Sequence, residues 1–73
     1  MSGSRPRNDG LIRVLAIWRL LQDGRWTLTE LAARYRVSTR TIRRDLIALQ
    51  VVGIPVAHSS ESDDNQKGLW WIR

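Results

Sequence analysis

Five arginines lie within a stretch of eleven residues near the middle of this chain, and no acidic residue interrupts them. A guanidinium is always charged, and its planar fork can donate paired hydrogen bonds to phosphate oxygens or to O6 and N7 of guanine. The natural partner of such a stretch is a polyanion, although charge alone predicts complementarity and not identity. Hydroxyl side chains are interspersed with the arginines. The arginines are Arg34, Arg36, Arg40, Arg43 and Arg44, and the hydroxyls are those of Ser38, Thr39 and Thr41.

The sequence lacks the residues that a disulfide, a metal site or a catalytic site would require. The chain has no cysteine for a disulfide or a thiolate metal site, and His58 alone cannot bind a metal without several carboxylate partners. Because no nucleophile–base pair, glycine-rich phosphate loop or paired-carboxylate motif is present, we expect neither an enzyme nor a cofactor site. No window is apolar for long enough to span a bilayer, and the N-terminus lacks the apolar stretch of a secretory signal. We therefore expect a soluble, cytoplasmic protein without a membrane partner.

The chain has 73 residues and a net charge of +5, which is unevenly distributed. Residues 1–55 hold ten arginines against four acids, whereas residues 56–73 hold two bases against three acids. A chain of this length makes one small domain, and its core must come from packing alone. The four tryptophans, with many Leu, Ile and Val residues, make such a core plausible.

Two helix start signals position the arginines. Thr27, with Glu30 three residues later, forms a capping box that predicts one helix, packed through Leu28, Leu31, Ala32 and Tyr35. Ser38 predicts the start of the next helix, which runs to about Gln50 and buries Ile42, Leu46 and Leu49 at i, i+4 and i+7. At about 100° per residue, Arg40 and Arg44 share the opposite face, with Arg43 to one side.

A further helix is predicted before this pair. Residues 1–8 have no periodicity and predict a flexible arm, after which Asn8 or Asp9 can cap a helix over about residues 10–22. This helix is apolar on more than one side, as expected if its own domain wraps around it or if it docks a partner. One predicted face holds Leu11, Val14, Leu15, Trp18 and Leu21, and the other holds Ile12, Ala16 and Leu20.

The C-terminal part predicts strands. Residues 54–58 read as an edge strand, since Pro55 is tolerated at edges or strand starts, and residues 69–72 read as a second strand. A third short strand is possible at residues 25–26. Two strands joined by a polar loop predict a β-hairpin, so the chain divides into an arm over residues 1–8 and one domain over residues 9–73.

These residues resemble the N-terminal winged helix-turn-helix of DeoR-like and WYL-domain bacterial transcription regulators. The resemblance covers roughly residues 11–72, and its specific part is the block in which the caps, the turn, the apolar positions and the arginines fall in register. It is carried by residues 31–32, 35–38, 39–46, 49–50 and 53–55. The fold class that it implies is mainly α with a small β-hairpin, a three-helix winged helix-turn-helix. In that family the module binds operator DNA, and a larger C-terminal domain senses a ligand or oligomerises.

Two departures from the family pattern stand out. Arg36 occupies a turn position where the family often has glycine, and if that position has a positive φ, a non-glycine residue costs roughly 1 kcal/mol. The predicted wing tip carries Glu61, Asp63 and Asp64, which are unfavourable beside phosphates. We therefore do not expect this tip to grip the DNA backbone.

The predicted function is sequence-specific binding of double-stranded DNA, with the helix at about residues 38–50 in the major groove. Arg40 and Arg44 are the first candidates for base contacts, followed by Thr39 and Arg43. The remaining DNA-binding candidates are Arg36, Ser38 and Thr41, which suit the phosphate backbone.

Several of these residues also have purely structural interpretations. Ser38 serves as a cap whether or not it touches DNA. Asp45 is expected to pair with a nearby arginine, and the four tryptophans are expected to pack in the core or the wing.

The sequence is also compatible with two other functions. The domain could be a winged-helix protein–protein interaction module, which the Ile12, Ala16 and Leu20 side favours, or the DNA-targeting domain of a larger DNA-processing enzyme. For assembly, we expect a monomer or weak dimer. A homodimer would form through C-terminal sequence missing from this chain, through the first helix, or on DNA.

Overall fold

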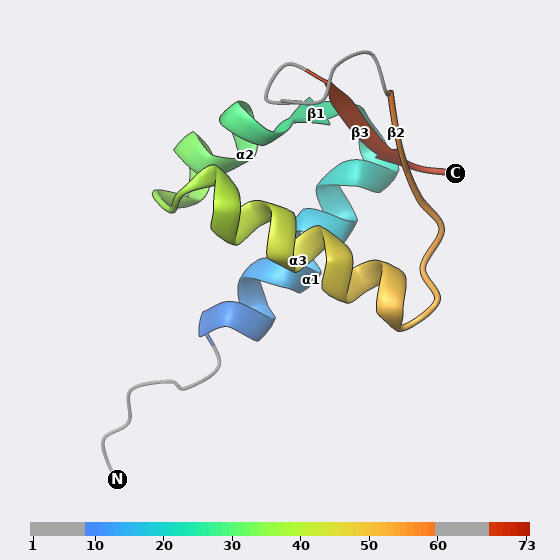
Figure 1. Cartoon of the computed structure of the whole chain (residues 1–73), viewed down its shortest axis with the longest axis horizontal. Helices are drawn as coiled ribbons and strands as arrows, with labels where there is room; N and C mark the ends of the chain where they lie inside the picture. Colours follow the sequence, from blue (N-terminus) through green and yellow to red (C-terminus); the bar gives the residue numbers. More distant parts are fainter. Residues whose placement is uncertain (1–8, 60–67) are drawn as a thin grey trace, which may run out of the picture.

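The computed structural model describes residues 9–59 and 68–73, which form three helices and one small sheet (Figure 1). The elements, in chain order, are α1 (Asp9–Asp23), β1 (Trp26–Thr27), α2 (Leu28–Tyr35), α3 (Thr39–Val51), β2 (Val56–His58) and β3 (Leu69–Ile72). This architecture confirms the predicted three-helix winged helix-turn-helix. The predicted arm over residues 1–8 and the predicted wing-tip acids lie outside the described residues.

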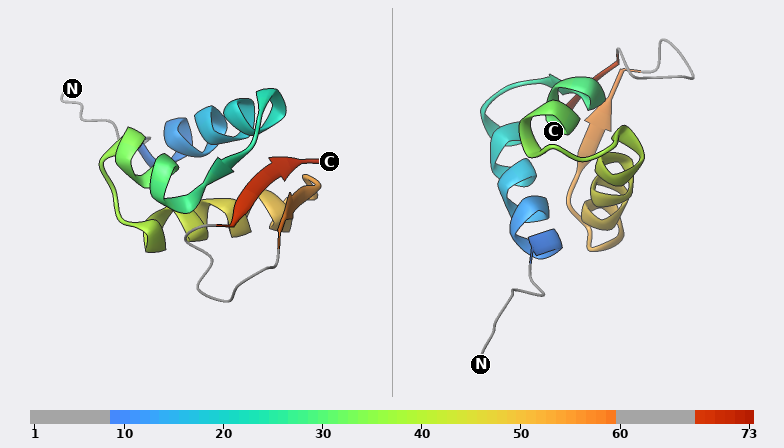
Figure 2. Two further views of the ribbon diagram at one scale, coloured as in Figure 1. Left: turned by 90° about the horizontal axis from the view of Figure 1, so that it is seen from above. Right: turned by 90° about the vertical axis from the view of Figure 1, so that its left-hand side faces the viewer.

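The sheet is antiparallel, with strand order β1-β3-β2. Trp70 in the central strand β3 lies opposite Trp26 of β1 and His58 of β2. The possible third strand therefore exists, one residue later than the sequence suggested. Both views of Figure 2 show α1 and α3 on two sides of the molecule, with β2 and β3 closing the space between them at one end.

The start of α2 forms as its sequence predicts. Thr27 has an extended backbone (φ −92°, ψ 162°), so the chain passes directly from β1 into the helix. The Glu30 amide donates to Thr27 Oγ1 at 3.0 Å, and the Thr27 amide donates to Glu30 Oε1 at 2.9 Å. This reciprocal pair satisfies two backbone N–H groups that a helix start leaves without partners.

The core lies between the three helices and the sheet. Ile42, Leu46 and Leu49 of α3 are buried, which confirms the inner face predicted for that helix. Leu28, Leu31 and Ala32 of α2 are buried against them, as expected, and Tyr35 is half-buried. The other buried apolar residues of the core are Ile17, Leu21 and Trp70.

The face predicted for α1 was correct in part, since Leu21 is buried and Val14 and Trp18 pack against the core. The buried centre of the helix is Ile17, with Leu21 one turn later, whereas Leu11 and Leu15 are 57% and 48% exposed. Apolar residues surround most of this helix, so their periodicity alone could not select the side that packs. The partly buried ion pair of Arg13 with Asp45, described below, joins α1 to α3 next to this packing contact.

The strand before the wing begins at Val56, two residues later than predicted. Gly53 has φ +95° at the end of α3, where its amide donates to the Gln50 carbonyl at 2.9 Å and the Ile54 amide donates to the Leu49 carbonyl at 3.0 Å. These two bonds form a Schellman motif, which uses Ile54 to close the helix rather than to begin a strand. The sequence analysis did not predict these bonds, because residues 54–58 were assigned to a strand.

Candidate nucleic-acid interface

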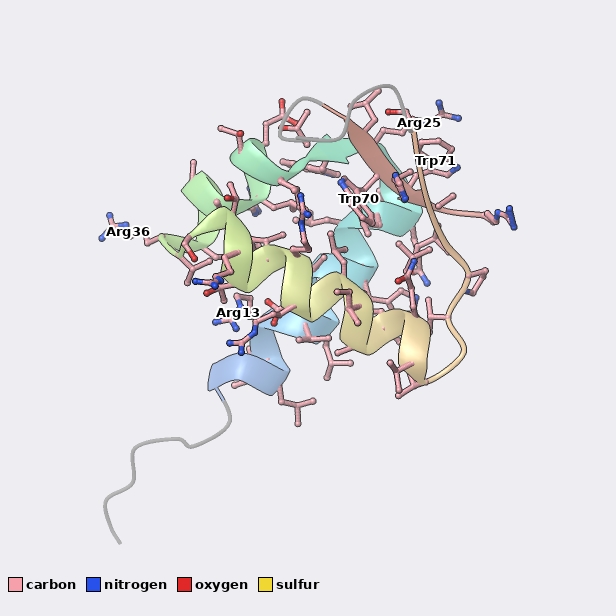
Figure 3. All side chains as sticks on the ribbon, in the orientation of Figure 1. Arg13, Arg25, Arg36, Trp70 and Trp71 are labelled. Carbon is pink, nitrogen blue, oxygen red and sulfur yellow. The ribbon has the colours of Figure 1, made fainter. Side chains whose placement is uncertain are left out.

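A tight turn joins α2 to α3. Arg36 ends α2 in the left-handed conformation (φ 57°, ψ 46°), and the amides of Arg36 and Val37 both donate to the Ala32 carbonyl. The backbone then extends at Ser38, which begins α3. Within the described residues, Arg36 is the one non-glycine residue with a positive φ. Its exposed side chain extends away from the body of the protein (Figure 3).

Ser38 and Thr41 cap α3 together. The Thr41 amide donates to Ser38 Oγ at 3.1 Å, and the Ser38 hydroxyl donates to Thr41 Oγ1 at 3.1 Å. The predicted capping role of Ser38 is therefore confirmed. Since a hydroxyl carries one donor and two acceptor positions, this arrangement leaves the Thr41 hydroxyl hydrogen available to an acceptor outside the cap. A DNA contact by either residue stays a prediction.

The outer face of α3 is basic. Arg40, Arg43 and Arg44 are exposed on the side opposite the buried Ile42, Leu46 and Leu49, in the arrangement that the sequence predicted. Thr39, at the first position of the helix, is half-buried. The structure brings these side chains to one surface beside Arg36, and their contact with DNA stays a prediction.

Arg34 belongs to the same basic stretch but to a different surface. Its guanidinium lies 5.7 Å from the Trp26 ring centroid and 6.0 Å from that of Tyr35. Such cation–π contacts hold the charge against α2 and β1.

Ile47 is a surface residue of α3 that was not among the predicted site residues. It follows Arg43 by four residues and Arg44 by three, so it continues their row on the helix, and it is 49% exposed. Val51 lies one further turn along and is 77% exposed. The same periodicity that places the arginines on the outer face places Ile47 there too, but its aliphatic residue type gives no signal for a polar or ionic contact.

Asp45 is turned away from the basic surface. It is buried, and its carboxylate accepts from Arg13 Nε at 2.5 Å and from Arg13 Nη2 at 3.2 Å. The predicted arginine partner thus exists, but on α1 and 32 residues earlier, not on a neighbouring turn of α3. The pair removes the acid's charge from the outer face of α3 and connects this helix to α1.

The tryptophans have packing roles, as expected. Trp70 is in the core, and Trp18 and Trp26 pack against it. Trp71 is half-buried, with the Arg25 guanidinium 4.3 Å from its ring centroid. His58 stacks on Trp70 with the ring centroids 4.3 Å apart.

Residues 13–58 match the sequence profile of the DeoR-like helix-turn-helix domain, a span that begins in α1 and ends with β2. The chain belongs to the DeoR-like helix-turn-helix family. Neither the curated proteins nor the solved structures contain a significant match. Membership of the DeoR-like family implies DNA binding by a transcription regulator.

Among residues 9–59 and 68–73, no group of three or more His, Asp or Glu side chains could hold a metal ion. None of the helices in this part of the chain has the length and apolar character that crossing a membrane requires.

Proposed function

We propose that this domain binds specific sequences in double-stranded DNA, with α3 in the major groove. The observation that carries the proposal is the division of α3 into a buried apolar face and an exposed face with three arginines. In this orientation, Arg40 and Arg44 donate to guanine O6 and N7, and Thr39 and Arg43 contact neighbouring bases or phosphates.

The turn before α3 suits the phosphate backbone. Arg36 extends from the turn, and the Thr41 hydroxyl lies in the first turn of the helix beside Ser38. Backbone N–H groups at a helix start carry partial positive charge and favour an anion. We assign phosphate contacts to these three residues, which fix the register of α3 without reading sequence.

Ile47 adds an apolar contact to this surface. An aliphatic side chain in the major groove can pack on the C5-methyl group of thymine, which distinguishes thymine from cytosine. Because Ile47 lies one turn beyond Arg43 and Arg44, its contact would fall on a base pair next to those read by the arginines.

The biological setting is also part of the proposal. The resemblance to DeoR-like and WYL-domain proteins supports a bacterial regulator that acts at the nucleoid in the cytoplasm. In such a regulator a separate domain would sense the ligand, and this domain would contribute DNA reading without catalysis.

Selection of binding sites from a random duplex pool with the 73-residue chain tests the proposal directly. On the selected site, Arg40→Ala and Arg44→Ala should each weaken binding by about 1–3 kcal/mol and relax the base preference at one position. Arg19→Ala, which removes an exposed arginine from α1, is the matched control and should have a much smaller effect. Equal affinity of wild type and the Arg40→Ala/Arg44→Ala double variant would refute α3 as the reading element.

A protein–protein interaction module is the second candidate. The exposed apolar residues Leu11, Ile12 and Leu15 of α1 favour it. An interaction module would not bind duplex DNA with a steep dependence on salt, so the same binding assay separates the two functions.

A further inference from the structure

A shallow apolar groove lies between the first half of α1 and the last half of α3. Its volume is about 380 Å³, and Ile54, after the end of α3, completes it. The α1 wall includes Leu11, Leu15 and Trp18, and the other wall includes Ala48 of α3 and Val52, the C-cap residue of that helix.

The groove is open and carries no uncompensated charge. Leu11, Leu15 and Val52 are 57%, 48% and 72% exposed, so much of its apolar surface faces solvent. Asp45 is the charged residue among those that line it, and the bidentate contact with Arg13 neutralises its carboxylate. An apolar patch of this kind on a small soluble domain indicates a surface that another molecule covers.

We propose that a second copy of this chain docks in the groove, forming a two-fold symmetric pair. In such a pair the same patch meets itself, so the contact must not place like charges together. Two copies that each carry a net charge of +5 repel one another, and an uncharged apolar groove is a region where contact brings no ionic penalty. Through the basic face of α3, by contrast, the exposed arginines of two copies would oppose each other.

The small apolar area of the groove predicts a weak dimer. Complete burial of one Leu or Val side chain removes on the order of 100 Å² of apolar area from water. The groove residues together offer on the order of 400 Å² per copy, about half of the roughly 800 Å² per partner in a standard interface. Polar residues around the groove would have to supply the remaining interface area. We therefore expect a dimer that dissociates at micromolar concentrations rather than an obligate dimer.

The groove's location leaves the basic surface free. Arg40, Arg43 and Arg44 lie in the first half of α3, whereas Ala48 and Val52 lie at its other end. A pair formed through the groove could therefore present two α3 helices to half-sites about one helical turn apart. This consequence rests on the proposed function, whereas the self-association itself does not.

Sedimentation of the 73-residue chain from about 1 to about 500 μM, a range spanning the expected micromolar dissociation, tests the pair directly. The test variant is Leu15→Glu, and Ile12→Glu is its matched control on the same helix. Ile12 is 60% exposed but lines a different hollow with Ala16, Tyr35 and Val37. Both variants place the same charge at an exposed site of α1, so general electrostatic effects cancel. Val52→Glu repeats the test from α3 if Leu15→Glu does not melt cooperatively.

We expect concentration-dependent dimerisation of the wild type, weakened at least about tenfold by Leu15→Glu and less than about threefold by Ile12→Glu. A wild type that stays monomeric throughout the range would overturn the proposal, as would equal weakening by the two variants. Leu15→Glu should bind a single selected half-site as tightly as wild type. Failure of the wild type to bind any duplex would refute the proposed function but would leave the sedimentation result to judge the groove.

Discussion

Arg36 combines backbone strain with an exposed charge. A residue with a Cβ at φ 57° costs roughly 1–2 kcal/mol relative to its relaxed conformations, and glycine would avoid this cost. Its two neighbouring amide bonds to Ala32 would form equally well with glycine, so the fold does not require arginine there. The side chain is the remaining reason for this residue, which supports a contact with a phosphate.

Stability and DNA affinity should therefore change in opposite directions at this position. Arg36→Gly should raise the free energy of unfolding by about 1 kcal/mol, or roughly 4–8 °C in Tm, while weakening duplex binding. Arg36→Lys keeps the charge and the strain, and it should stay close to wild type in both. Thermal melting and fluorescence anisotropy measure the two effects. Wild-type affinity in Arg36→Gly would remove Arg36 from the interface.

Ile47 gives a residue-scale test of base reading. Replacing thymine with deoxyuridine in the selected site, one position at a time, removes a single methyl group. At one position this should weaken wild-type binding by about 0.8 kcal/mol, roughly fourfold, because one buried methyl is lost. Ile47→Ala should lose this sensitivity, whereas Val52→Ala, on the groove side of α3, should keep it. Equal deoxyuridine effects in wild type and Ile47→Ala would contradict the thymine contact.

At the scale of elements, one ion pair connects the reading helix to the rest of the core. Asp45 has 9% of its side-chain surface exposed and Arg13 has 20%, so the carboxylate depends on its partner more than the guanidinium does. Arg13→Met keeps the aliphatic stem but leaves the carboxylate buried without its counter-ion. Breaking such a pair is costly, whereas replacing both partners with apolar residues is often nearly neutral.

We therefore expect Arg13→Met to lower the free energy of unfolding by about 2–4 kcal/mol, somewhat below the fully buried range because Arg13 is partly exposed. The double variant Arg13→Met/Asp45→Leu should recover most of this loss. Arg19→Met, at an exposed site of α1, should stay within about 0.5 kcal/mol of wild type. Urea denaturation measures the free energy of unfolding of all three variants, provided that its slope against urea concentration stays the same as in wild type. A loss below 0.5 kcal/mol for Arg13→Met would mean that the pair does not hold α1 against α3.

The elements that the sequence predicted well are those specified by local chemistry. Thr27, Glu30 and Ser38 act on their own helix starts, and the single apolar stripe of α3 leaves one way to bury it. The face of α1 could be predicted only in part, because apolar side chains occur on several sides of that helix and its burial depends on the elements packed against it. The groove could not be predicted for the same reason, since residues from two helices line it.

Across the whole molecule, two surfaces with different chemistry are spatially separate. The basic surface occupies the α2–α3 turn and the first half of α3, and the apolar groove lies at the far end of α3. Such separation allows DNA binding and pairing to be altered independently. It also predicts that substitutions in the groove leave DNA affinity for one half-site close to wild type, and that substitutions in the basic surface leave the dissociation constant of the pair close to wild type.

Salt dependence tests the electrostatic role of the whole basic surface. Each neutralised phosphate releases counter-ions, so the logarithm of the binding constant falls with the logarithm of salt concentration by about 0.9 per contact. With Arg36, Arg43 and the start of α3 on the backbone, one copy on one half-site should have a slope of about −2 to −4. Arg36→Gly should reduce its magnitude by about one, whereas Arg40→Ala, which removes a base contact, should lower specificity with a smaller change in slope. A slope near zero for the wild type would exclude phosphate binding by this surface, and an identical slope in Arg36→Gly would assign its phosphate contacts to other residues.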